Sequence, residues 1–128
     1  MAARNLVATL GGMVRYADVA TEAVALDDES SARVFVRHQL PDLLGSTRRD
    51  ADLRATLLAY SAAGLNAHTA ARALGVAERT LRYRLTHLES VLGADFRGRM
   101  PELVVAVKLH AALLHQRSKR QPGGDGWA

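Results

Sequence analysis

The chain has 128 residues, enough for one domain with a single core, and its hydrophobic content of 48% is ordinary for a globular protein. Cysteine is absent, which excludes disulfides and thiolate metal sites and suits a reducing cytoplasm. Lys and Arg outnumber Asp and Glu by 17 to 13, so the net charge of +4 is mild and agrees with an anionic partner without requiring one.

Residues 1–26 are interpreted as a linker or as the tail of a preceding domain. Residues 2–10 can form a short helix, the glycine pair at 11 and 12 marks a turn, and Asp18 can cap a second short helix. No run approaches the roughly 18 apolar residues of a membrane span, and polar residues interrupt any secretory core. We therefore expect neither membrane insertion nor export.

An acidic cluster at residues 27–31 is typical of a helix start. It opens a helix that Pro41 ends, and the residues predicted to bury one side of it are Val34, Phe35 and Leu40. The next helix is expected to begin at Asp50 or Asp52 and to run until Gly64. Its apolar residues, which should brace the segment that follows, are Leu53, Leu57, Leu58 and Tyr60.

Residues 66–93 hold two short helical patterns that meet at one glycine, the spacing of a helix-turn-helix. Asn66 can cap a helix over residues 67–74, in which Ala70, Ala71 and Leu74 lie close together, and Gly75 can close it in the left-handed conformation. The second helix begins at Glu78. Its inward stripe consists of Leu81, Leu85, Leu88 and Leu92.

The opposite face of the second helix is polar and carries a phenol ring. At about 100° per residue, Arg79, Tyr83 and Thr86 point outward, flanked by Thr80 and Arg82. Guanidinium and hydroxyl groups suit phosphates and base edges, so this face favours major-groove DNA as the partner. The alternative from the pattern alone is an ordinary corner between two packed helices with a solvated basic face.

A loop after Gly93 leads to Pro101, which is well placed as a first helical residue. The residues predicted to share one face of this last helix are Leu103, Val107, Ala111 and Leu114. Beyond Gln116 the tail is basic and then rich in glycine, so residues 117–128 are expected to be disordered.

The stretch ARALGVAERTLRYRLTHLESVLG resembles the C-terminal DNA-binding domain of the PucR/CdaR family of transcriptional regulators, whose helix-turn-helix is Fis-like. The hexamer TLRYRL at residues 80–85 carries most of the match, and the likeness covers roughly residues 13–116. In such regulators a sensory portion and a degenerate GGDEF-like domain precede this domain. The resemblance thus implies a C-terminal fragment or a short stand-alone relative.

The resemblance also implies which residues contact DNA. It puts base and phosphate contacts on Thr80 and Tyr83, with Arg82 and Arg84 next to the backbone. The chain departs from the family in having Ala77 and Glu78 where a polar or basic pair is usual. Ala77 is a poor cap, and Glu78 would repel phosphate unless it accepts a hydrogen bond from a cytosine amino group.

Catalysis has no candidate residues. The five histidines form no pair at i, i+4, and no Walker, HExxH or GxSxG motif occurs. We expect no enzyme activity, no metal, no cofactor and no small molecule bound by this domain.

Together these patterns predict an all-α fold, a small helical bundle containing a Fis-like helix-turn-helix, with the DNA-binding domain at residues 27–116. The function they favour is a cytoplasmic, sequence-specific DNA-binding transcriptional regulator whose partner is double-stranded DNA. A homodimer through parts missing from this chain is a further expectation. The alternative is a helical protein-interaction or dimerisation module without DNA binding. The predicted DNA-binding residues are Glu78, Arg79, Thr80, Arg82, Tyr83, Arg84 and Thr86.

Overall fold

The structure is a computed structural model that describes residues 28–120. Over this range it contains α-helices and one short 3-10 helix and no strand, which confirms the predicted all-α class. The two short helices predicted before residue 27 lie outside the described residues. The elements are α3 (Glu29–Gln39), α4 (Arg48–Ala62), α5 (Ala67–Leu74), α6 (Glu78–Leu92), η2 (Phe96–Arg99) and α7 (Met100–Arg120).

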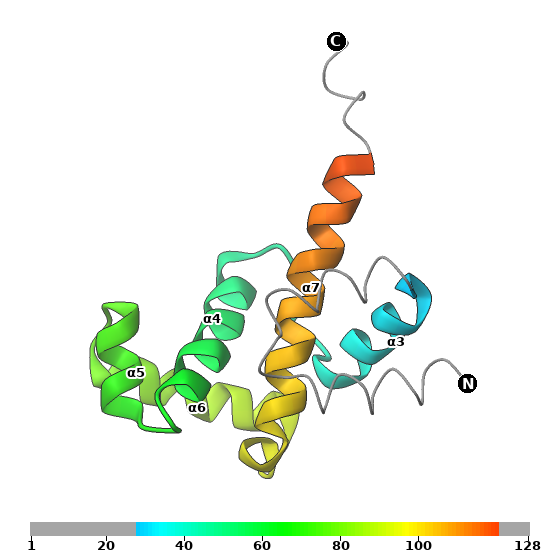
Figure 1. Cartoon of the computed structure of the whole chain (residues 1–128). Coiled ribbons are helices and arrows are strands. Elements are labelled where there is room, and N and C mark those ends of the chain that lie inside the picture. Colours follow the sequence, from blue (N-terminus) through cyan, green and yellow to red (C-terminus); the bar gives the residue numbers. More distant parts are fainter. Residues whose placement is uncertain (1–27, 121–128) are drawn as a thin grey trace.

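Two helices, α4 and α7, form the middle of the bundle. Helix α7 packs against α3 and α4, while α4 also packs against α5 and α6. Figure 1 shows α3 and α5 on opposite sides of this central pair. The helix-turn-helix therefore occupies one side of the molecule, and α3 covers the other.

Helix α3 begins and ends at the predicted signals but buries a different face. Asp28 caps it by accepting a hydrogen bond from the Ser31 amide at 3.3 Å, and the helix ends at Gln39, just before Leu40 and Pro41. The prediction that Val34 is buried was wrong, because its side chain is 53% exposed. The residues that share the buried face, at helical spacing, are Ala32, Phe35, Val36 and Leu40.

Helix α4 starts earlier than either predicted aspartate. Thr47 is its cap, with its hydroxyl oxygen accepting from the Asp50 amide at 3.1 Å, and the Asp50 carboxylate accepts from the Gly45 amide at 2.9 Å. Arg54 donates to the carbonyl oxygens of Leu43 and Gly45 at 2.6 and 3.0 Å. These bonds hold the preceding loop against α4, so the loop and the helix start are one local unit.

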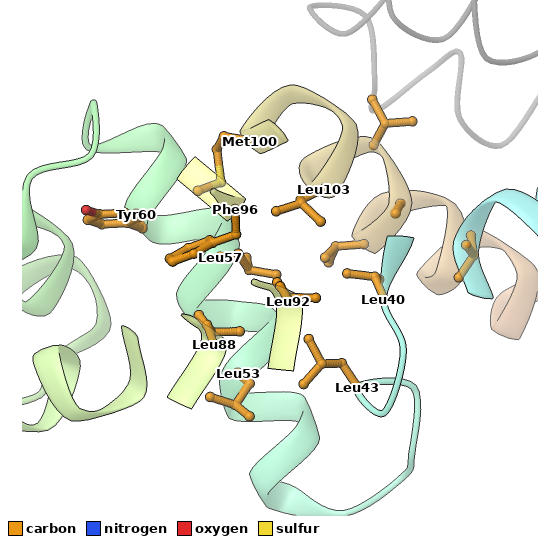
Figure 2. Packing of buried hydrophobic residues seen from close by; sticks show 14 of the residues in the cluster. Leu40, Leu43, Leu53, Leu57, Tyr60, Leu88, Leu92, Phe96, Met100 and Leu103 are labelled. Atoms are coloured by element: carbon orange, nitrogen blue, oxygen red, sulfur yellow. The ribbon is translucent and has the colours of Figure 1, made fainter. Parts of the chain in front are cut away.

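The core is a single apolar cluster to which every described helix contributes. Figure 2 shows part of it, with Leu57 of α4, Leu88 of α6, Phe96 of η2 and Leu103 of α7 all in the interior between the helices. All four of these side chains are fully buried, whereas Leu58, also predicted to supply apolar area, is only partly buried. Because α6 contributes to this same cluster, the position of its outer face is fixed by the core.

Helix α7 confirms part of its predicted face. Leu103 and Val107 are buried, but Ala111 and Leu114 are exposed, and Leu109 and Leu113 are buried in their place. The buried face of α7 is wider than predicted because the helix packs against both α3 and α4, and a single narrow stripe of residues cannot cover both contacts. The helix also continues to Arg120, beyond the predicted boundary at Gln116, since residues 117–120 contain no glycine or proline.

Candidate nucleic-acid interface

The first helix of the motif, α5, has the predicted boundaries. The Asn66 side chain accepts from the Thr69 amide at 2.9 Å, and Gly75 ends the helix with a φ of 69°. The amide of Val76 then donates to the carbonyl of Ala71 at 3.0 Å, which closes the helix end as a glycine at this position allows. A Cβ on Gly75 would meet no atom within 4 Å, so the position needs glycine for its backbone conformation rather than for space.

The second helix, α6, is fixed by its apolar stripe and not by its cap. Ala77 makes no side-chain capping bond, as predicted for a poor cap, and the helix begins at Glu78. The four leucines of the stripe are all buried, and they are Leu81, Leu85, Leu88 and Leu92. On α5, Ala70 and Ala71 are buried, while Leu74, which was expected to share their face, is only partly buried.

The outward face of α6 is exposed as the periodicity predicted. Arg79, Thr80, Tyr83 and Thr86 are all exposed, and the Tyr83 side chain is 71% accessible. Among the described residues Arg79 makes no hydrogen bond or ion pair, whereas the Thr86 hydroxyl donates to the carbonyl of Arg82 at 3.1 Å. This face thus presents a free guanidinium and a phenol ring to solvent.

Glu78 joins the two helices of the motif. One carboxylate oxygen accepts from Nε and Nη2 of Arg82 at 2.8 and 2.6 Å, and the other lies 3.2 Å from Nδ1 of His68 on α5. The hydrogen bonds from Arg82 and then His68 lower the pKa of Glu78 below its usual value. Its charge is therefore balanced locally by Arg82, a geometry that the sequence alone did not reveal.

A second polar group ties α6 to α4. Arg84 places Nη2 3.5 Å from Oδ2 of Asp52, and its side chain is only 22% exposed. Arg48 lies 3.9 Å from the same carboxylate oxygen but is almost fully exposed. Arg49, the next residue of α4, contacts Nε2 of His87 on α6. Arg84 thus points toward α4, and Arg48 and Arg49 lie at the edge of the α6 face.

A mostly apolar hollow of about 340 Å³ lies between α4 and α6, beside Tyr83. The rings of Tyr83 and His87 meet edge to face, with centroids 6.4 Å apart, and Leu53 and Thr80 also line the hollow. An aromatic ring, a hydroxyl, the Asp52 carboxylate and two arginines, Arg49 and Arg84, therefore surround one concave surface next to the outward face.

Comparison with known families identifies the segment that carries this geometry. Residues 53–115 match the PucR C-terminal helix-turn-helix domain, from α4 through α5 and α6 into α7. This segment belongs to that family. No curated protein and no solved structure gives a significant match to the chain.

The PucR-type domain is a domain of DNA-binding regulators, so the resemblance seen in the sequence is confirmed at the level of the family.

None of the helices that the structure describes is long and apolar enough to cross a membrane. Within the same described residues, no group of three His, Asp or Glu side chains could hold a metal ion.

The structure brings most of the predicted site residues of the PucR-type domain onto one face. Arg79, Thr80, Tyr83 and Thr86 share it, Arg82 flanks it in contact with Glu78, and Arg84 turns away toward Asp52. Sequence reasoning missed Arg48 and Arg49. The adjacent arginines in the first turn of the helix before the motif are a signal that could have identified them.

Proposed function

We propose that this chain is a sequence-specific DNA-binding transcriptional regulator in which α6 enters the major groove. The observation that carries the proposal is the exposed face of α6 in a PucR-type domain. There Arg79 has no partner among residues 28–120, and Tyr83 is 71% exposed. A recognition helix needs outward groups that reach base edges while its other side is held rigidly. Here the buried leucine stripe supplies that support.

The side chains divide by the atoms they can reach. Arg79 can donate two hydrogen bonds to O6 and N7 of guanine, and Thr80 and Tyr83 lie within the same first two turns. Arg82 and Thr86 flank this group and are assigned to the DNA backbone. Such backbone contacts place the helix in register without reading sequence.

Glu78 and Arg84 have supporting roles in this proposal. Glu78 holds Arg82 through two hydrogen bonds and balances its charge, so the carboxylate repels phosphate less than an isolated one would. Arg84 pairs with Asp52 and fixes α6 against α4. Arg48 and Arg49, at the edge of the face, are placed to meet phosphates on the flanking backbone.

We further propose that residues 27–116 form the DNA-binding domain, that its role is not enzymatic, and that DNA is read by two copies. A palindromic site places two recognition helices about one helical turn, roughly 34 Å, apart.

The test is selection of bound duplexes from a random library by the full chain, followed by anisotropy titrations at several salt concentrations. Arg79→Ala should weaken binding to the selected site by about 1 to 3 kcal/mol and bring it closer to the affinity for unrelated duplexes. Arg37→Ala is the matched control, because it removes an exposed arginine from α3 on the far side of the bundle.

Two results would contradict the proposal. One is a selection that enriches no sequence. The other is an affinity for DNA that hardly changes with salt, because phosphate contacts release counterions and make binding salt-dependent. Either result would favour the alternative of a helical protein-interaction module.

A further inference from the structure

A second hollow, of about 240 Å³, lies between α3 and α7. It is separate from the DNA face, since Figure 1 places α3 on the opposite side of the central helices from α5. Its charged and titratable lining consists of Arg33, Arg37, His110 and Arg117. No carboxylate belongs to that lining among the described residues, so the hollow is electropositive.

Two of its three arginines have unused hydrogen-bonding capacity. Arg33 donates through Nε and Nη2 to the Glu29 carboxylate at 3.0 and 2.7 Å. Within the described part of the chain, Arg37 and Arg117 make no hydrogen bond or ion pair, and both are exposed. One guanidinium from α3 and one from α7 therefore border the hollow without an anionic partner.

His110 supplies an independent observation. Its Nε2 atom is buried and has no hydrogen-bond partner among the described residues. Leaving a buried polar atom unpaired is unfavourable, so such an atom calls for a partner that is not part of the fold. Burial lowers the pKa of His110, and the positive charges of Arg54 and Arg33 lower it further.

We propose that this hollow binds a small oxyanion, a carboxylate or a phosphate group, between Arg37, Arg117 and His110. Guanidinium groups present paired donors that match the oxygens of either anion, and Nε2 of His110, when it carries a proton, donates a further hydrogen bond. The volume is below that of a drug-sized pocket, so the ligand is small. This proposal departs from the expectation from sequence that the domain binds no small molecule.

The same phosphate chemistry has two sources, a free anion and the DNA backbone. The site favours the free anion, because it lies away from the α6 face. The proposal does not depend on DNA binding, and the anion titration that tests it is carried out without DNA. Failure of the anion site and failure of the DNA-binding proposal are therefore distinguishable.

The test is a titration of the full chain with inorganic phosphate and, separately, with citrate, at constant ionic strength set with chloride. The ring nitrogens of His110 are observed by long-range ¹H–¹⁵N correlation NMR. We expect a saturable shift of the Nε2 resonance and a rise in the pKa of His110, because a bound anion offsets the positive charges that face the imidazole. These charges belong to Arg33, which is paired with Glu29, and Arg37 on α3, Arg54 on α4, and Arg117 on α7.

The double variant Arg37→Gln/Arg117→Gln should lose the saturable shift while keeping the helical circular dichroism of the parent. The matched control is Arg72→Gln/Arg97→Gln, which removes two exposed arginines elsewhere and should bind the anion as before. A linear shift without saturation, or equal binding by the Arg37/Arg117 variant, would overturn the proposal.

A DNA arm separates the two sources of phosphate. The Arg37→Gln/Arg117→Gln variant should bind duplex DNA within about twofold of the parent, roughly the loss of weak long-range attraction alone. A loss of tenfold or more would mean that this hollow contacts the DNA backbone, and the free-anion assignment would be wrong.

Discussion

Leu88→Ala should destabilise the domain strongly, because the Leu88 side chain is fully buried where α6 meets the core. The change removes three carbon atoms, which at about 0.8 kcal/mol per CH₂ gives a loss of about 2.4 kcal/mol from transfer alone. The cavity left behind raises the total to about 3 to 5 kcal/mol. Alanine is the best helix former, so no part of the loss comes from helix propensity.

Urea denaturation and thermal melting followed by circular dichroism measure this loss. For a domain of this size each kcal/mol lowers Tm by roughly 4 to 8 °C, so Leu88→Ala should lower it by more than about 10 °C. Leu114→Ala is the matched control, with the same chemical change on a side chain that is 48% exposed in α7, and it should cost less than about 1 kcal/mol. Equal midpoints for the two variants would refute the assignment of the α6 stripe to the core.

Three further predictions concern charge. Glu78→Gln should strengthen non-specific DNA binding at low salt more than Glu89→Gln, because only Glu78 holds Arg82. Glu89→Gln is the control, an equal charge change at the other end of α6. Anisotropy titrations with unrelated duplexes measure both variants, and equal gains in affinity would contradict this prediction. Arg84→Ala should reduce DNA affinity less than Arg79→Ala, since Arg84 already pairs with Asp52; a larger loss for Arg84→Ala would contradict this role. The lowered pKa of His110 means that its contribution to stability is complete above about pH 6.5 and falls as the pH drops toward the folded-state pKa. Urea midpoints across this pH range should change less in His110→Gln than in the parent. Equal pH dependence in the two proteins would contradict the assignment of this effect to His110.

The helix-turn-helix was predictable because its signals are local. Asn66 and Gly75 set the ends of α5 through bonds to residues within one turn, and the leucine spacing of α6 follows its own period. The exposed position of Tyr83 follows from the same period. For these elements, neighbouring residues contain enough information to fix both the helix and its outward face.

Elsewhere the outcome depends on contacts between distant segments. Val34 and Leu114 are apolar but exposed, because the positions of α3 and α7 relative to each other decide which side of each helix is covered. The start of α4 depends on Thr47 bonding to Asp50 within a loop that has no periodic pattern. The pair of Arg84 with Asp52 joins residues 32 positions apart, so its geometry could not be read from the sequence of α6.

The most direct test of the central claim is a ¹H–¹⁵N correlation titration of the full chain with its selected duplex. If α6 enters the major groove, the largest amide shifts should fall on residues 78–87 and on the first turn of α4, with small shifts across α3. Shifts that concentrate on α3 and the C-terminal half of α7, or that are absent from α6 at saturating duplex, would contradict the account.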